Sequence, residues 1–365
     1  MSTKLKVAFL VTSLNPGGIE YYLLRFITHY QGEIDATVYC KSGKAGILHE
    51  KYETIGAKIV PFKLSFFNFI AYYKFYKELK RNNYDSICDF TGNFATLPLF
   101  SARFAGIKKR LVFYRGSSNH FKEDGLRLLY NNLMNYLIPH VSTYILANSK
   151  ASLNFFFKNK WKDNSKYEVI YNGINASQFL SEDENLRNEL KIPVDAFVTG
   201  HVGRFNEAKN HKTIIEVAVE LCKKDSKNYF LFCGKGTDVF LRERVEQEGL
   251  DDQIKLLGLR KDVIKVLNTL NFFYFPSLSE GQPNALIEAL IAGLPFVASN
   301  IEPHLETIPK SHHKQLIGPL DVQSALKKII KTKENNTFSK SLTLKEWAIE
   351  KYNPEFLFKL FFEKL

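Results

Sequence analysis

The sequence predicts an α/β protein made of two doubly wound domains, and three observations support this fold class. Short apolar runs suited to buried strands alternate with stretches that carry apolar residues at helical spacing. The alternation runs through the first half of the chain and restarts after a polar stretch at residues 181–195. The chain has 365 residues, which is too many for one compact core and enough for two.

In the first half, a strand is predicted at residues 6–11, and a glycine turn then leads into a helix within residues 15–27. Helical patterns also separate the later apolar runs, one of them at residues 67–83. Because βα alternation places helices on both faces of a parallel sheet, we expect such a sheet here. Its remaining predicted strands lie at residues 35–40, 86–90, 109–114 and 143–149.

The second half repeats the pattern of strand and helix. Its predicted strands lie at residues 196–203, 229–234, 254–258, 272–276 and 295–299. Its predicted helices lie at residues 211–224, 239–249, 263–270 and 284–293.

The domain boundaries follow from these patterns. We expect an N-terminal domain at residues 1–185 and a C-terminal domain at residues 190–340, joined by the polar stretch as a linker. Residues 341–365 are expected to form amphipathic helices that break at Pro354 and pack back on the N-terminal domain. Sheets of this kind bind ligands beyond the carboxyl ends of their strands, so we expect a site in a cleft between the domains.

Composition argues against several classes of protein. The four cysteines are widely spaced, which predicts neither a disulfide framework nor a zinc site and suits the reducing cytoplasm. No secretory leader is expected, and no apolar run approaches the ~20 residues of a membrane span. Metal-binding and dinucleotide motifs such as H-E-x-x-H, D-x-D and G-x-G-x-x-G are absent, so neither a metal nor a cofactor is expected.

The net charge of +12 is concentrated in the first half of the chain. Residues 1–190 carry 25 Lys and Arg against 16 Asp and Glu, a net of +9, whereas residues 191–365 carry 25 against 22, a net of +3. Within this half, residues 66–81 and 153–166 interleave aromatic residues with lysines. Such stretches fit contact with an anionic membrane surface, and they also fit core helices with a basic outer face.

The segment at residues 276–299 contains two glutamates on either side of a helix start. Pro283 suits the first helical position, which places Glu280 in the preceding loop and Glu288 inside the helix. The amides of Gln282, Asn284 and Ala285 would then lie at the positive end of the helix dipole, which favours a phosphate or a sugar hydroxyl. On spacing alone, the segment favours an ordinary core helix with one solvated glutamate.

Two further segments carry ligand-binding patterns at strand ends. Arg204 and Lys209 follow the first strand of the second domain, where two cations can clamp a diphosphate or simply form a polar turn. Glycines at 17, 18, 234 and 236 also follow strands, where they allow a ligand to approach the backbone. Each glycine pair alone is more typical of a turn.

Taken together and in order, these segments resemble the retaining glycosyltransferases of family 4, which have the GT-B fold of two Rossmann-like β/α/β domains that face each other across a cleft. The resemblance covers most of the chain, and its most specific part is the paired-glutamate segment. The matching segments are residues 15–20, 147–152, 169–175, 202–211, 232–236, 256–263 and 279–295.

The resemblance implies a retaining, metal-independent hexosyltransferase that uses a UDP- or GDP-sugar. Its acceptor would be a glycan or a lipid-linked sugar in the synthesis of a cell-surface polysaccharide, in the cytoplasm or at the inner face of the cell membrane. It implies no nucleic-acid partner. The nearest alternatives are a nucleotide-sugar epimerase of similar fold and a non-catalytic protein that binds nucleotides or anions.

Site residues carry over by position. Arg204 and Lys209 would neutralise the departing diphosphate, Glu280 would bind hydroxyls of the donor sugar, and Glu288 would bind the ribose. The other implied donor-binding positions are Gly17, Gly18, Gly203, Gly234, Leu259, Arg260, Gly281, Gln282, Pro283, Asn284, Ala285 and Leu286.

One position departs from the family pattern. Many members carry a histidine at the end of a strand in the N-terminal domain, where this chain has Arg115 and, five residues later, His120. An arginine cannot serve as a general base, although it can bind hydroxyls or an anion. Either Arg115 or His120 is expected to serve the acceptor side.

Overall fold

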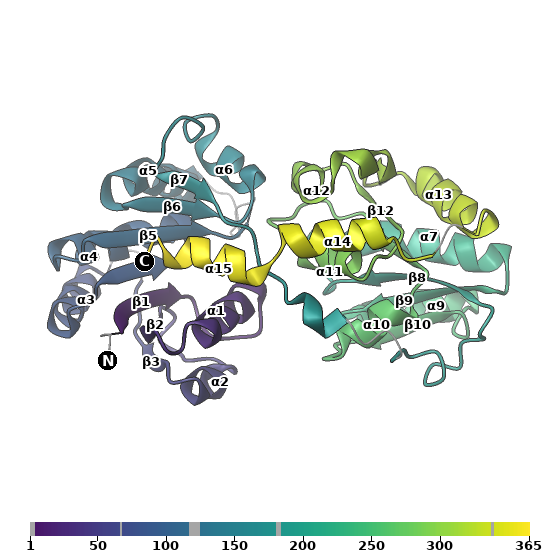
Figure 1. The fold of residues 1–365 in the computed structure, drawn as a ribbon, viewed down its shortest axis with the longest axis horizontal. Coiled ribbons are helices and arrows are strands. Elements are labelled where there is room, and N and C mark those ends of the chain that lie inside the picture. The colour runs from purple at the N-terminus through teal and green to yellow at the C-terminus, as the bar shows by residue number, and fades with distance from the viewer. Residues whose placement is uncertain (1–3, 66–67, 117–124, 180–183, 337–338) are drawn as a thin grey trace. The chain divides into compact units, whose positions relative to one another are not determined.

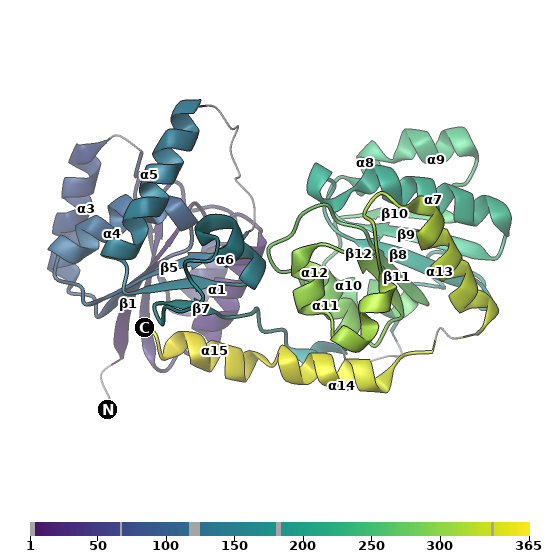
Figure 2. The same ribbon diagram turned by 90° about the horizontal axis from the view of Figure 1, so that it is seen from above.

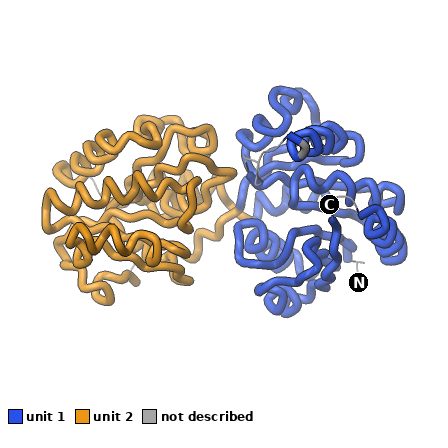
Figure 3. Tube along the Cα trace, turned by 180° about the vertical axis from the view of Figure 1, so that it is seen from behind, with its two compact units in different colours: residues 1–172, 355–365 blue, residues 173–354 orange. Residues whose placement is uncertain are grey.

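Each half of the chain forms a parallel sheet with helices on both faces (Figure 1). The computed structural model describes residues 4–65, 68–116, 125–179, 184–336 and 339–365. The chain divides into two compact units, which Figure 3 colours separately. Unit 1 comprises residues 1–172 and 355–365, and unit 2 comprises residues 173–354. Both units are doubly wound, so the predicted α/β class is confirmed.

Unit 1 contains a seven-stranded sheet in the order β3-β2-β1-β4-β5-β6-β7. Its strands are β1 Leu5–Val11, β2 Ile34–Cys40, β3 Lys58–Pro61, β4 Ser86–Asp89, β5 Lys109–Tyr114, β6 Tyr144–Ala147 and β7 Tyr167–Val169. Its helices are α1 Gly18–His29, α2 His49–Thr54, α3 Phe69–Asn82, the 3-10 turn η1 Gly92–Ala95, α4 Thr96–Phe104, α5 Gly125–Val141, α6 Lys150–Phe157 and α15 Pro354–Phe362.

Unit 2 contains a six-stranded sheet in the order β10-β9-β8-β11-β12-β13. Its strands are β8 Phe197–Val202, β9 Asn228–Cys233, β10 Ile254–Gly258, β11 Phe272–Phe275, β12 Phe296–Ser299 and β13 Leu316–Ile317. Its helices are η2 Ala176–Phe179, η3 Glu207–Lys209, α7 His211–Lys224, α8 Thr237–Phe240, α9 Arg242–Glu248, α10 Val263–Thr269, α11 Asn284–Ile291, α12 Glu302–Thr307, η4 Lys310–Gln315, α13 Val322–Glu334 and α14 Leu342–Lys351.

In both sheets the strand order reverses beside the first strand of the unit. β1 pairs with β2 on one side and β4 on the other, and β8 likewise pairs with β9 and β11. The loops after β1 and β4 leave the sheet in opposite directions, as do those after β8 and β11, which opens a crevice at the carboxyl ends. The motifs singled out in the sequence follow these strands.

Alternate residues of the central strand β1 pack on opposite faces of the unit 1 sheet. Phe9 belongs to a buried cluster with residues of α1 and α15, whereas Leu10 belongs to another with residues of α3, α4, α5 and α6. The C-terminal helix α15 is tied in by aromatic packing, with the rings of Phe361 and Phe26 4.5 Å apart. Burying one such ring stabilises the fold by roughly 1.5–3 kcal/mol.

Several predicted boundaries are wrong. The described part of the predicted linker belongs to unit 2, because Leu186 is buried and its N–H donates to Thr269 Oγ1 at 2.8 Å. The units divide at residues 172–173 instead of at residues 185–190. The predicted helix at residues 239–249 is replaced by two short helices, α8 and α9.

The C-terminal tail is shared between the units. We expected both of its helices to pack on the N-terminal domain, but α14 belongs to unit 2 and only α15 joins unit 1. Pro354 begins α15, where it has no intrahelical bond to lose. Across the described ranges, no helix is both long and apolar enough to cross a bilayer.

Candidate active site

The structure brings Lys209 and Glu280 together at the switch point of unit 2. Lys209 ends η3 in the loop after β8, and Glu280 lies in the loop after β11. The Lys209 Nζ atom is 2.5 Å from Glu280 Oε1, and the two side chains are only 18% and 10% exposed. Lys209 Nζ also lies 4.7 Å from the centre of the Phe275 ring. The predicted cation and the predicted sugar-binding carboxylate are therefore one partly desolvated ion pair.

Short-range hydrogen bonds hold these two loops in register. Asn206 caps η3 by accepting a bond from the Lys209 N–H at 3.0 Å. Asn210 adopts a left-handed backbone conformation, and its Nδ2 donates to the carbonyls of Pro276 at 3.1 Å and Pro319 at 2.8 Å. The position of Lys209 is therefore set by its neighbours on both sides.

Gly203 and Gly234 allow two loops to touch through their backbones. A Cβ at Gly234 would lie 2.1 Å from the Gly203 carbonyl oxygen, and the φ of Gly234 is +151°. A Cβ at Gly203 would lie 2.7 Å from His201 Nε2. Any other residue at position 234 would force the loops after β8 and β9 apart. Gly234 therefore allows Gly203 to stay in place beside the Lys209 side chain.

The start of α11 matches the predicted range of residues 284–293, but Pro283 is not the first helical residue as expected. Pro283 is the N-cap, and α11 begins at Asn284, because the Asn284 N–H donates back to the Gln282 carbonyl at 3.1 Å. The Asn284 amide, which was predicted to face a ligand, is therefore already hydrogen-bonded within this turn. Among the three predicted amides, that of Ala285 is in the first helical turn, which has no intrahelical acceptor of its own.

Glu288 lies inside α11 and is half-buried. Its carboxylate contributes to raising the pKa of Cys233 to about 11, an effect caused chiefly by burial of the thiol. Arg260 lies near the same thiol and pairs with Asp262 at 2.7 Å and Glu189 at 2.8 Å, while Leu259 is 75% exposed. The guanidinium of Arg260 is thus engaged by carboxylates.

Three buried histidines surround the ion pair, and the sequence analysis did not select them. Burial lowers the pKa of His211 and of His304 to about 4, and it lowers the pKa of His201 well below its usual range. The charge of Lys209 lowers all three pKa values further. A histidine within the apolar run of β8 was the available signal. These neutral rings leave Lys209 as the cation of the cluster.

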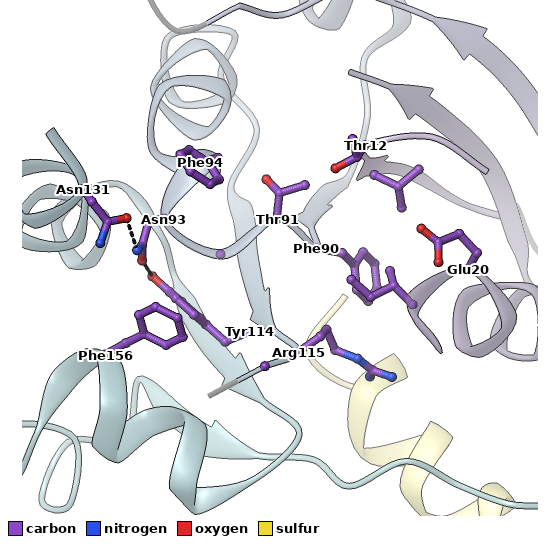
Figure 4. A pocket seen from close by; sticks show the side chains of 14 residues that line it. Thr12, Glu20, Phe90, Thr91, Asn93, Phe94, Tyr114, Arg115, Asn131 and Phe156 are labelled. Carbon is purple, nitrogen blue, oxygen red and sulfur yellow. Dashed lines mark hydrogen bonds between the residues drawn. The ribbon is translucent and has the colours of Figure 1, made fainter. Parts of the chain in front are cut away.

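Unit 1 has a pocket of about 220 Å³ at the carboxyl ends of β1, β4 and β5 (Figure 4). Its polar lining includes Thr12, Glu20, Thr91, Asn93, Arg115 and Asn131. Figure 4 shows the hydrogen bonds that order one wall: Asn93 Nδ2 donates to Asn131 Oδ1 at 2.6 Å, and the Tyr114 hydroxyl donates to Asn93 Oδ1 at 2.8 Å. The asparagines were missed because they lie in segments without a recognised motif.

Of the two acceptor-side candidates, the structure places Arg115 in this pocket. Its guanidinium stacks with Cζ 3.9 Å from the centre of the Tyr22 ring and 4.8 Å from that of Phe113. Burial lowers the pKa of Arg115 to about 10, so the side chain remains a cation at neutral pH. His120 lies outside the described residues.

A buried ion pair supports η1, the element that carries Asn93 in the wall of the pocket. Lys41 Nζ is 2.8 Å from Asp89 Oδ2, donates to the Phe94 carbonyl at 3.1 Å, and also donates to Thr91 Oγ1. Burial lowers the pKa of Lys41, and the neighbouring Asp89 opposes this shift. Lys41 therefore ties η1, which lines the pocket, to the end of β4.

The remaining predicted residues are less constrained. Gly17 is the N-cap of α1, and a Cβ at Gly18 would meet open space, so position 18 leaves room beside the loop after β1. Arg204 is exposed. Within the described ranges, no group of three or more His, Cys, Asp or Glu side chains is arranged to hold a metal ion.

Comparisons with known proteins agree with this architecture. Residues 182–350 match the model of the family described as Glycosyl transferases group 1, and residues 16–178 match that of Glycosyltransferase Family 4. The capsular polysaccharide biosynthesis glycosyltransferase CapH of Staphylococcus aureus is 28% identical over 349 residues, 92% of this chain and 94% of CapH.

Two further proteins are similar over much of the chain. The UDP-Gal:alpha-D-GlcNAc-diphosphoundecaprenol alpha-1,3-galactosyltransferase of Escherichia coli is 24% identical over 72% of this chain and 70% of its own. The crystal structure of Anabaena Alr3699/HepE in complex with UDP superposes with a TM-score of 0.82 at 19% identity, covering 98% of this chain and 99% of HepE. This likeness confirms the GT-B fold. The two family models together span nearly the whole chain, which therefore belongs to the GT-B glycosyltransferases of family 4, with a group 1 transferase domain as its C-terminal half.

Proposed function

We propose that this glycosyltransferase moves a hexose from a UDP- or GDP-sugar to a glycan or a lipid-linked sugar during the synthesis of a cell-surface polysaccharide. The observation that carries the proposal is the pairing of Lys209 with Glu280 beside the N-terminus of α11. The relatives support the biological setting, since CapH is named for capsule biosynthesis and the E. coli relative for a diphosphoundecaprenol-linked acceptor. HepE, the structural neighbour, was crystallised with UDP.

The donor grip follows from charge. When the bond between the sugar and the diphosphate breaks, the departing phosphate gains negative charge, so a cation nearby stabilises the transition state more than the bound donor. Lys209 and Arg204 would supply that charge, and the first-turn amides of α11 would add hydrogen bonds. Glu280 would give up its ion pair with Lys209 and accept hydrogen bonds from hydroxyls of the donor sugar. Glu288 would accept hydrogen bonds from the ribose.

We propose retention of the anomeric configuration without a metal ion. If the acceptor attacks from the face that the diphosphate leaves, the phosphate oxygen itself can take the acceptor proton. No side-chain base is then needed, which accommodates Arg115 at the position where many relatives have histidine. Positioned cations take the role that a divalent ion has in other sugar transferases.

The acceptor would bind in the unit 1 pocket. Glu20, Thr91 and the two linked asparagines present the acceptors and donors that sugar hydroxyls require, and the Tyr114 ring lends an apolar surface. Arg115 would bind a hydroxyl or an anionic group of the acceptor. The four cysteines are buried and free, which suits an enzyme of the reducing cytoplasm.

Ligand-induced stabilisation tests the donor site. Thermal unfolding should be screened with UDP-, GDP- and ADP-sugars, because a ligand that binds only the folded state raises the unfolding midpoint. We expect a UDP- or GDP-sugar to raise it, and no response to any sugar nucleotide would contradict the proposal.

Transfer tests the chemistry. With the donor identified, NMR of the product from an acceptor screen should show the anomeric configuration of the donor, and excess EDTA should leave the rate unchanged. An inverted product or a rate abolished by EDTA would contradict these two parts. Isomerisation of the donor sugar without any acceptor would identify an epimerase instead.

A further inference from the structure

An aromatic groove lies between α3 and α4 of unit 1, apart from the candidate active site. It has a volume of about 450 Å³, and its lining includes Phe69, Tyr73, Tyr76, Leu97 and Phe104. The helices on its two sides are joined by a bond from Ser101 Oγ to the Tyr72 carbonyl at 3.3 Å. Figure 2 shows α3 and α4 side by side on unit 1. We call this surface the α3–α4 face.

Large apolar side chains of the α3–α4 face are exposed. Phe69 is 72% exposed, Tyr73 57% and Phe104 75%, and Ile70, which follows Phe69 in α3 but does not line the groove, is 70% exposed. Burial in the core explains the other apolar positions of α3, such as Phe75 and Leu79, but it does not explain these four. A contiguous exposed apolar surface of this kind marks a contact with a partner or a membrane.

The charges on the α3–α4 face select the partner. The exposed lysines 74, 77 and 80 follow the aromatic residues along α3, and Lys77 Nζ lies 4.7 Å from the centre of the Tyr73 ring. α3 has one acidic residue, Glu78, which is paired with Arg81, and α4 has none. Aromatic rings that enter the headgroup region, with lysines beside them to meet lipid phosphates, are the pattern of an interfacial helix.

The second stretch of aromatics and lysines found in the sequence does not share this property. Leu153 and Phe157 are buried in the unit 1 core, and Phe156 and Trp161 pack against it. Phe155 is the one large apolar residue of this group that is exposed. The core-helix alternative therefore holds for residues 153–166. In the first stretch, residues 66–67 lie outside the described part of the chain.

The α3–α4 face is linked to the acceptor pocket through η1 and α4, which follow each other in the chain. Phe94 of η1 lines the pocket, and Leu97, three residues later in α4, lines the groove. A sugar bound in the pocket could thus be attached to a lipid held by a bilayer at α3 and α4. We propose that the α3–α4 face docks unit 1 on an anionic phospholipid bilayer and so presents the pocket to a lipid-linked acceptor. The acceptor part of this inference rests on the proposed function, whereas the docking does not.

Vesicle flotation of the full chain tests the docking without any sugar nucleotide. We expect the wild type to float with phosphatidylcholine vesicles that contain phosphatidylglycerol, and to do so less as salt is added or phosphatidylglycerol is omitted. Phe69→Ser/Phe104→Ser should lower the partition coefficient about 10-fold or more by removing two interfacial rings. Lys74→Glu/Lys77→Glu should lower it about 10-fold or more through charge.

The matched control is Val194→Ser/Leu320→Ser in unit 2, which removes side chains that are 93% and 68% exposed and should leave flotation unchanged. Wild-type protein that stays off anionic vesicles at low salt would overturn the inference, as would equal flotation of the Phe69→Ser/Phe104→Ser and control variants. Self-association without lipid that is abolished by Phe69→Ser/Phe104→Ser would show a contact between copies and overturn it too.

A separate readout distinguishes this inference from the proposed function. Stabilisation by a sugar nucleotide should be the same in the wild type and in Phe69→Ser/Phe104→Ser. The groove belongs to unit 1, and its lining includes no predicted donor-binding residue. If the wild type floats but no sugar nucleotide stabilises it, docking stands and the donor assignment fails. If sugar nucleotides stabilise it but anionic vesicles do not bind it, the docking fails alone.

Discussion

The side chains of Lys209 and Glu280 form an ion pair, with Nζ 2.5 Å from Oε1, across two loops that leave neighbouring strands in unit 2. Each would have a different task once a donor is bound, since a diphosphate attracts the ammonium and sugar hydroxyls donate to the carboxylate. In the proposed mechanism, the pair would keep both groups neutralised and in place until a donor replaced each partner. Low exposure of both side chains makes this exchange energetically significant.

Removal of Lys209 should damage the chemical step. Lys209→Ala is expected to lower kcat/KM about 10-fold or more, about 1.4 kcal/mol of transition-state stabilisation, because it removes a charge beside the leaving group. Steady-state kinetics with the identified donor would measure this. Lys212→Ala, which changes an exposed lysine three residues away, should leave kcat/KM unchanged. Wild-type turnover in Lys209→Ala would show that Lys209 has no part in the chemical step.

Glu288 should affect donor binding more than turnover. Its place inside α11, away from the loop that carries Glu280, suits a contact with the ribose, and such a contact is the same in ground and transition states. We expect Glu288→Ala to raise the donor KM about 10-fold with little change in kcat. Glu246→Ala, on an exposed part of α9, serves as the control. An unchanged KM would argue that Glu288 only supports the helix.

Arg115 should affect the acceptor alone. Arg115→Ala removes a cation stacked on Tyr22 in the unit 1 pocket, so acceptor KM should rise while stabilisation by the sugar nucleotide stays at its wild-type value. Arg115→Lys should restore little, since the ammonium lacks the planar group that stacks on the ring. The two readouts are acceptor kinetics and thermal shift. Loss of the donor-induced shift in Arg115→Ala would contradict this assignment.

The Lys41–Asp89 pair should stabilise the fold as a coupled unit, so that the two residues contribute non-additively to the free energy of unfolding. Lys41→Met leaves the buried Asp89 carboxylate without its cation and should lower the free energy of unfolding by about 3–5 kcal/mol. Lys41→Met/Asp89→Asn should be less destabilised than the sum of the single variants, because the stranded charge is gone. Chemical denaturation of the four proteins measures the coupling. Additive losses would show that the pair does not act as a unit.

The sequence could predict the elements that follow strong local patterns. The buried runs of β1, β8 and β11 and the glycine and glutamate segments after them were recognisable, because strand period and turn chemistry are local properties. The prediction of a linker at residues 181–195 was wrong, because Leu186 and Arg187 form hydrogen bonds with Thr269 and Asn271 of unit 2, over 80 residues away. Such long-range bonds leave no local trace.

The same distinction applies to the candidate site. Lys209 and Glu280 were selected separately, by their family resemblance, but that they pair directly follows only from the packing of β8 beside β11. The pocket asparagines Asn93 and Asn131 come together across 38 positions in the chain. Burial, which decides the behaviour of the three histidines, is also a property of the folded unit.

The last prediction concerns pH and the buried histidines of unit 2. His211 and His304 have pKa values of about 4 in the folded protein, against 6.5 without burial, and His201 is also lowered. At a pH between these values the unfolded chain binds more protons than the folded one, so stability is full above pH 6.5 and falls as the pH drops toward 4. Each histidine contributes up to about 1.4 kcal/mol per pH unit within that window.

Urea denaturation at a series of pH values measures this slope. His211→Gln should fall less steeply than the wild type between pH 6.5 and 4, whatever its stability at neutral pH, because one titrating group is gone. His29→Gln, at an exposed position of α1, should keep the wild-type slope. The carboxyls of Asp225, Asp262 and Asp321 have lowered pKa values and weaken the fold only below about pH 3.8, so they lie outside the window. A flat profile in the wild type would mean that these histidines are hydrated or protonated in the folded protein, and that Lys209 does not stand alone as the cation of its cluster.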